Sequence, residues 1–199
     1  MRDLEIRGAG NLLGSEQSGH MMDVGYDMYL KLLEEAVLEE KGETAPVRTE
    51  CSADLSVTAN IPEKYIPSPE QRMDLYRRIA FIRTEADADD VTDELIDRFG
   101  DPPAAVNALI HVALLRGEAG RAGITDITQK KGAMYFTLRD FTMERVSELY
   151  ARKEFKGRIR VEAGREPRLG LMLRPGAKPI AEARALVSAW KDTEPTAAS

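Results

Sequence analysis

Hydrophobic side chains recur along much of this chain at spacings of three and four residues, the pattern that places them on one face of a helix. The first such stretch runs from Asp23 to Lys41, and Gly42 follows it as a C-terminal cap. A second helix is expected to begin after Ser68, because a capping serine, a proline and then Gln71 form a helix-start signal. Its buried stripe is Leu75, Ile79 and Ile82.

Four further helices are predicted downstream. The acidic stretch from Glu85 forms one of them, and Gly100 ends it. The side chains expected to face inward from that helix are Val91, Leu95, Ile96 and Phe99. Asp101 and Pro102 are expected to cap and start the next helix, and Thr142 to cap the one after it. The last helix carries the stripe Ile180, Ala183, Val187 and Trp190.

Alternation of apolar and polar residues, which is typical of strands with one buried face, marks the other elements. The expected strands are 54–59, 124–128, 133–138, 158–163 and 169–174. In the fourth of these, Arg158 and Arg160 are expected to face solvent while Ile159 and Val161 are buried. DNA contact by the two arginines is the less favoured alternative.

A block of helices followed by a strand-rich second half indicates an α+β fold. We expect a glycine-rich loop and a helix at the N-terminus, followed by a compact domain of helices packed on a small mixed or antiparallel sheet. The expected divisions are residues 1–47 for the loop and linking helix, 48–192 for the compact domain and 193–199 for a disordered tail.

Composition argues against several classes of protein. No apolar run approaches the roughly 20 residues that cross a bilayer, and the N-terminus lacks the apolar stretch of a secretory signal, so a cytoplasmic location is expected. Cys51 is the one cysteine, and His20 and His111 are the only histidines. Because these residues offer no metal-ligand spacing, no metal site is predicted.

Charge is segregated along the chain, whose net charge is -6. Residues 85–101 hold eight carboxylates against Arg98, a balance of -7, whereas residues 152–174 hold eight cations against three carboxylates. Two faces of opposite charge favour docking on another protein over wrapping of DNA around this one. Glu94 and Asp97 are three residues apart on one helix face and are candidates for contact with a partner's arginines, although a solvated helix face also explains such a run.

The sequence lacks the motifs of nucleotide-binding and hydrolytic enzymes. No stretch matches the phosphate-binding loop G-x-x-x-x-G-K-[ST]. Gly8 and Gly10 could begin the dinucleotide-binding motif G-x-G-x-x-G, but Leu13 stands at its sixth position, where a small residue is needed. Neither histidine has a candidate nucleophile beside it. The sequence therefore predicts no catalytic residue.

The N-terminal segment carries a long motif. The run RDLEIRGAGNLLG at residues 2–14, followed by EQSG at residues 16–19, resembles the translocation motif shared by transcription-repair coupling factors and the RecG helicase. The continuation, which includes YIP at residues 65–67 and ELIDRFG at residues 94–100, is similar to the coupling factors rather than to RecG. The likeness fades after about Gly123.

This resemblance implies roles for the motif. Arg7 and Gln17 are expected to help couple ATP hydrolysis to movement on duplex DNA, while Gly8, Gly10 and Gly14 give the motif its bends. In this family ATP and Mg belong to the motor domains. We therefore expect no cofactor in this chain and no enzymatic activity of its own.

The resemblance also implies partners. In the family, the terminal domain packs against a UvrB-like module at the other end of the protein and hides the surface that binds UvrA, until an encounter with stalled RNA polymerase releases it. The expected function is a non-catalytic, autoinhibitory part of a translocase that acts on duplex DNA and recruits nucleotide-excision repair, with no membrane partner. Glu94 and Asp97 are the expected latch residues. A free-standing nucleic-acid-binding protein is the alternative.

Overall fold

The computed structural model of this chain describes residues 51–162, 164 and 166–193. The predicted loop, the first helix and the motif residues Arg7, Gln17, Gly8, Gly10 and Gly14 lie outside the described residues, as do residues 194–199. The described elements, in chain order, are β1 (Ser52–Asp54), α3 (Pro69–Ala80), α4 (Glu85–Phe99), α5 (Ala104–Arg121), β2 (Ile124–Lys130), β3 (Ala133–Leu138), α6 (Met143–Ala151), β4 (Ile159–Glu162), β5 (Arg168–Met172) and α7 (Pro179–Lys191).

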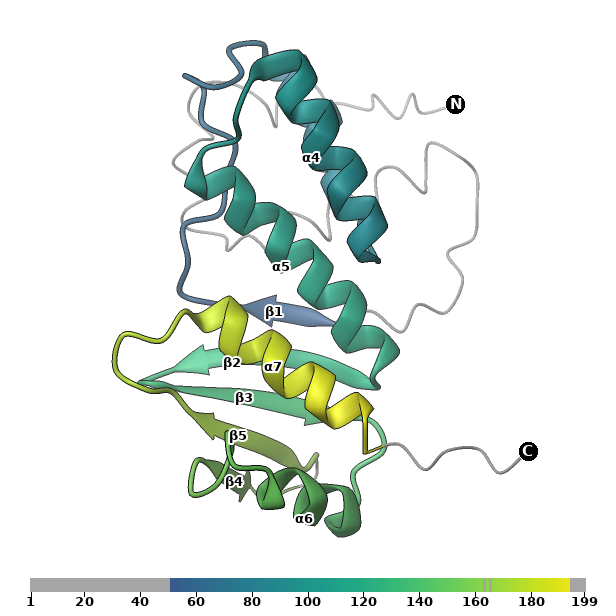
Figure 1. Cartoon of the computed structure of the whole chain (residues 1–199), viewed down its shortest axis with the longest axis vertical. Coiled ribbons are helices and arrows are strands. Elements are labelled where there is room, and N and C mark those ends of the chain that lie inside the picture. The colour runs from purple at the N-terminus through teal and green to yellow at the C-terminus, as the bar shows by residue number, and fades with distance from the viewer. Residues whose placement is uncertain (1–50, 163, 165, 194–199) are drawn as a thin grey trace, which may run out of the picture.

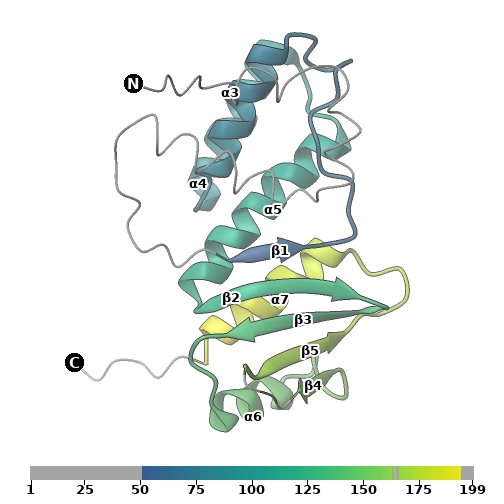
Figure 2. The same cartoon turned by 180° about the vertical axis from the view of Figure 1, so that it is seen from behind.

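The five strands form one mixed sheet in the order β1-β2-β3-β5-β4. β1 runs parallel to β2, and the remaining pairs are antiparallel. Lys131 and Gly132, both with positive φ, make the two-residue turn between β2 and β3, as such angles favour. The sheet occupies one end of the domain, with α5 and α7 on one of its faces (Figures 1 and 2). The predicted α+β fold is confirmed.

Two clusters of buried side chains define two lobes. In the sheet lobe, the sheet packs against α6, α7 and the C-terminal half of α5 around Trp190. In the helical lobe, α3 and α4 pack against the N-terminal half of α5 around Leu95. Helix α5 serves both lobes, because Leu114 belongs to the helical cluster and the next residue, Leu115, to the sheet cluster. A single continuous helix therefore joins the lobes.

Capping side chains start two helices where the sequence predicted. The Ser68 hydroxyl accepts a hydrogen bond from the N–H of Gln71 at 3.3 Å, at the start of α3. The Thr142 hydroxyl accepts from the N–H of Arg145 at 3.3 Å, at the start of α6. Each bond satisfies an N–H group that the first turn of a helix leaves without a partner.

Helix α5 starts two residues later than predicted. It begins at Ala104 and is preceded by Pro103, whose backbone is extended. Pro103 disfavours helical backbone at the residue before it, Pro102, so the helix cannot begin there. The prediction that Asp101 caps this helix is therefore wrong, and α5 has no side-chain cap.

The predicted strand over residues 54–59 is wrong. β1 ends as this segment begins, and beyond it the N–H of Val57 bonds to the nearby carbonyl of Leu55 at 2.8 Å. The segment crosses from one lobe to the other, so that Leu55 and Val57 pack on the sheet cluster and Ala59 packs on the helical cluster. Its alternation reflects one-sided burial without strand pairing.

Three residues differ from their predicted surroundings. Ile96 is 45% exposed, because α4 packs through Leu95 and the next residue is turned by about 100° around the helix. Val161 is 40% exposed, since β4 is a short edge strand. Thr193, expected in the tail, is buried and accepts a hydrogen bond from Nε of Arg145 at 3.0 Å, so it belongs to the domain.

Candidate functional site

Helix α4 begins with reciprocal capping bonds at Thr84. The Thr84 hydroxyl accepts a hydrogen bond from the N–H of Asp87 at 3.2 Å. An Asp87 carboxylate oxygen accepts from the N–H groups of Thr84 at 2.8 Å and Arg83 at 2.9 Å. The bond from Arg83 contributes most to lowering the pKa of Asp87, followed by those with Thr84. These bonds fix where α4 starts and therefore which of its side chains face outward.

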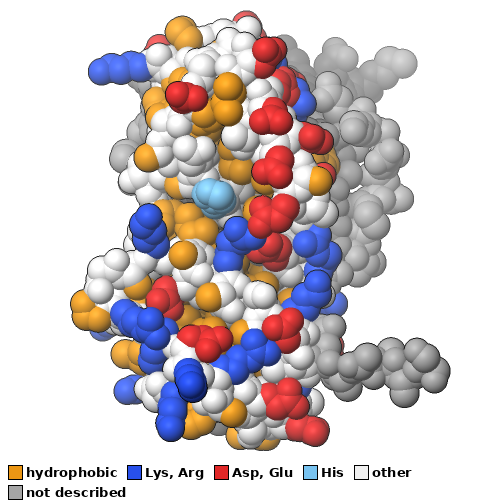
Figure 3. Space-filling model, in the orientation of Figure 1, with side chains coloured by type: hydrophobic (Ala, Val, Ile, Leu, Met, Phe, Trp, Pro, Cys, Tyr) orange, Lys and Arg blue, Asp and Glu red, His pale blue; other side chains and the backbone are white. Residues whose placement is uncertain are grey.

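The outer side of α4 is a band of carboxylates, which we call the acidic face. Its exposed members are Glu85, Asp89, Asp90, Asp93 and Asp97. Acidic side chains gather in a column on the side of the molecule where α4 lies (Figure 3). Ile96 stands in the same band, because positions 89, 93, 96 and 97 recur at spacings of three and four. The acidic face therefore combines negative charge with one large exposed apolar side chain.

The two predicted latch residues differ in their surroundings. Glu94 pairs with Arg78 of α3 and with Arg98 one turn along α4, the latter at 2.6 Å, and its side chain is only 19% exposed. Asp97 is exposed, and no ion pair involves it within the described part of the chain. The structure therefore leaves Asp97 available to a partner, whereas Glu94 also holds α3 and α4 together.

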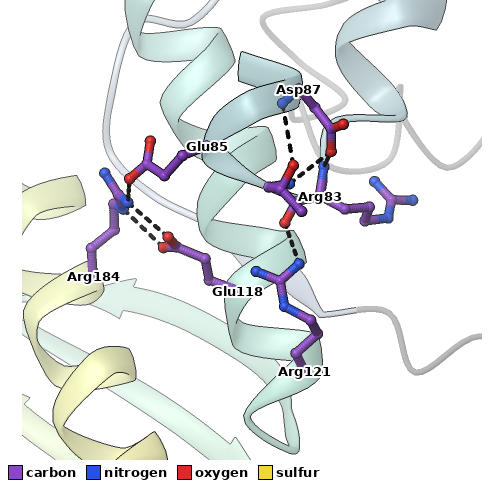
Figure 4. Close-up of polar contacts among 7 residues, drawn as sticks. Arg83, Glu85, Asp87, Glu118, Arg121 and Arg184 are labelled. Carbon is purple, nitrogen blue, oxygen red and sulfur yellow. Dashed lines mark hydrogen bonds and ion pairs between the residues drawn. The ribbon is translucent and has the colours of Figure 1, made fainter. Parts of the chain in front are cut away.

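Arg184 joins the N-terminus of α4 to the sheet lobe (Figure 4). Arg184 lies on α7 and donates two hydrogen bonds to Glu118 of α5, from Nε to Oε2 at 2.8 Å and from Nη2 to Oε1 at 2.7 Å. It also forms an ion pair with Glu85, in the first turn of α4. The bond with Glu118 is the largest cause that raises the pKa of Arg184.

The segment between α3 and α4 lies directly on α5 near this ion-pair group. Nη1 of Arg121 donates a hydrogen bond to the carbonyl of Arg83 at 2.6 Å. Gly117 faces the same backbone so closely that a Cβ there would lie 2.7 Å from the Cα of Arg83. The glycine therefore permits a contact that no side chain would allow.

The sequence did not reveal these contacts between the lobes. Arg184 and Glu118 are 66 residues apart in the chain, and no local pattern links them. Gly117 was the residue that could have indicated the contact at Arg83, because a glycine inside a helical pattern often marks a close approach of another segment.

The hairpin of β4 and β5, with Arg158 just before β4 and Arg160 within it, already uses some of its cations in internal contacts. Nη2 of Arg158 pairs with Glu182 of α7 at 2.5 Å, and its Nε donates to the carbonyl of Met172 at 3.0 Å. Arg160 is exposed. Of these two arginines, which were considered for DNA contact, the fold uses Arg158 to attach α7 to the hairpin.

Within the described residues, no group of three or more His, Cys, Asp or Glu side chains could hold a metal ion. In the same part of the chain, no helix is both long and apolar enough to cross a membrane.

Comparisons with known proteins indicate a single family. Residues 55–149 match the model of the TRCF domain. The transcription-repair-coupling factor of Bacillus subtilis is 38% identical over 172 residues, which are 86% of this chain and 14% of that protein. The one from Staphylococcus haemolyticus is 36% identical over 177 residues, 87% of this chain and 15% of that protein.

A solved structure has a similar fold. The crystal structure of the C-terminal domain of transcription-repair coupling factor superposes with a TM-score of 0.63, and the match covers 74% of this chain and 94% of that one. Its sequence identity is 17%, so this likeness shows the fold alone. The chain itself spans about 14% of the length of the curated relatives it matches.

Proposed function

Because this chain belongs to the transcription-repair-coupling factor family, we propose that it is a non-catalytic regulatory part of such a protein. The whole protein would be an ATP-dependent translocase on duplex DNA that removes stalled RNA polymerase and recruits nucleotide-excision repair. The described domain would dock on a UvrB-like module and hide the surface that binds UvrA. In this proposal ATP and Mg bind to motor domains, and Arg7 and Gln17 help to couple ATP hydrolysis to movement.

The observation that carries the proposal is the acidic face of α4. Its carboxylates are exposed and belong to a rigid, capped helix, so a partner with matching arginines would meet them in a fixed arrangement. Exposed ion pairs contribute only about 0 to 1 kcal/mol each. A contact made from several such pairs can orient two surfaces and still be released, as a reversible autoinhibitory contact requires.

Ile96 adds an apolar contact to this face. It is the exposed large hydrophobic residue of α4, and Asp93 and Asp97 lie one turn before it and next to it. Apolar side chains inside a charged rim commonly supply much of the binding energy of an interface, while the rim provides orientation. Asp97, Asp93 and Ile96 would therefore contact the partner directly, and Glu94 would support them from the side of α3.

Direct titration tests the docking. The 199-residue chain is titrated with the UvrB-like module of a coupling factor by calorimetry, at low and at high salt. We expect binding that weakens as salt rises, because exposed charges are screened. Asp97→Arg should weaken it at least tenfold, since charge reversal replaces attraction by repulsion. Glu148→Arg, the same charge change at an exposed acid on α6, is the matched control and should bind normally.

A nucleotide-binding measurement tests the non-catalytic part of the proposal. We expect no heat of binding when ATP and Mg are titrated into the chain, and no release of phosphate on incubation. Micromolar affinity for ATP in the purified chain would contradict the proposal, whatever the docking experiment shows.

A further inference from the structure

The acidic face belongs to the helical lobe, whereas most of the domain's apolar core lies in the sheet lobe. The lobes have separate buried clusters and share α5. Binding of a partner to the acidic face therefore depends on the orientation of α4 relative to the sheet lobe. The contacts that hold its N-terminal end come from α5 and α7 (Figure 4).

Arg184 is suited to hold α4 in place. Its guanidinium group is fixed by two parallel bonds to Glu118, an arrangement that sets the orientation of the group as well as its position. The remaining interaction, with Glu85, reaches the first turn of α4. A group fixed on α5 and α7 in this way restrains the end of a helix from the other lobe.

The length of α4 amplifies any movement at that end. Asp97 is twelve residues beyond Glu85, which corresponds to about 18 Å along a helix that rises about 1.5 Å per residue. A rotation of roughly 10° about the N-terminus would move Asp97 by about 3 Å, and an ion pair extends only to about 4 Å. A rotation of that size would therefore take Asp97 out of reach of a partner's arginine.

We infer that Arg184 is a positioning residue, which ties the N-terminus of α4 to the sheet lobe through Glu85 and so orients the acidic face for docking. This inference rests on the proposed function for its purpose. Its structural part, the restraint of α4, is independent of any partner. The backbone at Arg83, which Arg121 bonds and Gly117 contacts, is the point about which α4 would turn if the link to Arg184 were lost.

Hydrogen–deuterium exchange of the whole chain tests the restraint. Glu85→Gln removes the link to α4 but leaves the two bonds between Arg184 and Glu118 intact. We expect amides in the first two turns of α4 to exchange about threefold faster, while those of β3 in the sheet lobe are unchanged. Asp89→Asn is the matched control, because it removes one exposed negative charge from the same helix without touching Arg184.

A second variant separates the restraint from the charge of α4 itself. Arg184→Gln leaves the sequence of α4 untouched, and we expect the same acceleration at its amides. The double variant Glu85→Gln with Arg184→Gln should exchange no faster in α4 than either single variant, since each of them removes the same ion pair between Arg184 and Glu85. Fully additive effects, or unchanged exchange in both single variants, would overturn the inference.

Docking supplies the functional measurement. Titration of Arg184→Gln with the UvrB-like module should show affinity about threefold weaker than that of the unaltered chain, although Arg184 is not in the acidic face. If the unaltered chain does not bind the module, the proposed function fails, and the exchange experiment still decides whether Arg184 restrains α4. If exchange accelerates while affinity is unchanged, the positioning role is contradicted and the docking proposal stands.

Discussion

The guanidinium carbon of Arg145 lies 4.0 Å from the centroid of the Trp190 ring, a cation–π contact inside the sheet lobe. Arg145 is buried, and it also donates hydrogen bonds to the carbonyl of Trp190 and to the hydroxyl of Thr193, both at 3.0 Å. One cation thus connects α6 to the end of α7 and the residues that follow it.

Replacing this arginine should be costly. Arg145→Lys keeps the charge but loses the planar group that reaches both acceptors, so we expect a loss of about 2 to 3 kcal/mol in the free energy of unfolding. Urea denaturation followed by the fluorescence of Trp190 measures it. Arg160→Lys, at an exposed position, is the control and should change stability by less than about 0.5 kcal/mol.

The contact between Gly117 and Arg83 predicts a second effect on stability. A methyl group at residue 117 would lie 2.7 Å from the Cα and 2.9 Å from the carbonyl oxygen of Arg83, and backbone atoms cannot rotate away. Gly117→Ala should therefore cost about 2 to 4 kcal/mol. At Gly170 the nearest atom to a new Cβ is a ring carbon of Tyr135 at 3.4 Å, so Gly170→Ala should be tolerated. Equal stability of the two variants would contradict this account of the junction.

Asp87 makes stability depend on pH. Hydrogen bonds from Arg83 and Thr84 lower the pKa of this carboxyl below its ordinary value of 3.8. A carboxyl whose pKa is lower in the folded state stabilises the fold above the unfolded value and loses that contribution as pH falls through the folded value. Asp87→Asn should therefore be less stable than the unaltered chain at pH 7, and the difference should shrink below about pH 4.

Urea denaturation at pH 7, 4 and 3 measures this effect. The control is Asp89→Asn, which removes a charge from an exposed position of α4 that takes no part in the cap. A stability difference between the Asp87 variant and the unaltered chain that stays constant over this range would show that the cap does not depend on ionisation.

The two predicted latch residues should respond differently to charge reversal. In a full-length coupling factor that carries this domain, Asp97→Arg should raise affinity for UvrA, because it weakens the docking that is proposed to hide the UvrA-binding surface. Glu94→Arg should do the same but also lower the stability of the domain, since it places a third arginine between Arg78 and Arg98. Surface-plasmon binding to UvrA and thermal denaturation separate the two effects. Unchanged UvrA affinity in a folded Asp97→Arg variant would remove this residue from the role.

Local sequence patterns predicted the elements that local physics controls. The caps at Ser68 and Thr142 depend on bonds within a few residues, so the sequence contained what was needed to place them. The strand expected over 54–59 failed because one-sided burial and strand pairing give the same alternation. Only the position of the segment between the lobes distinguishes them.

For the candidate site, the sequence identified the acidic helix but not the state of its side chains. It grouped Glu94 and Asp97 by their spacing, yet the arginine of α3 that engages Glu94 could be found only after the helices had packed. Ile96 was expected inside together with Leu95, but α4 packs through Leu95 and this turns Ile96 to the outer side of the helix.

By itself, the sequence determined the α+β class, the starts of α3 and α6 and the concentration of negative charge on one helix, since these depend on residue type and spacing along the chain. The tertiary structure alone decided that Arg184, Glu118 and Glu85 meet, and that Gly117 lies against Arg83. The reason is that such contacts join residues from different elements, and their geometry is set by how the two cores pack on a shared helix.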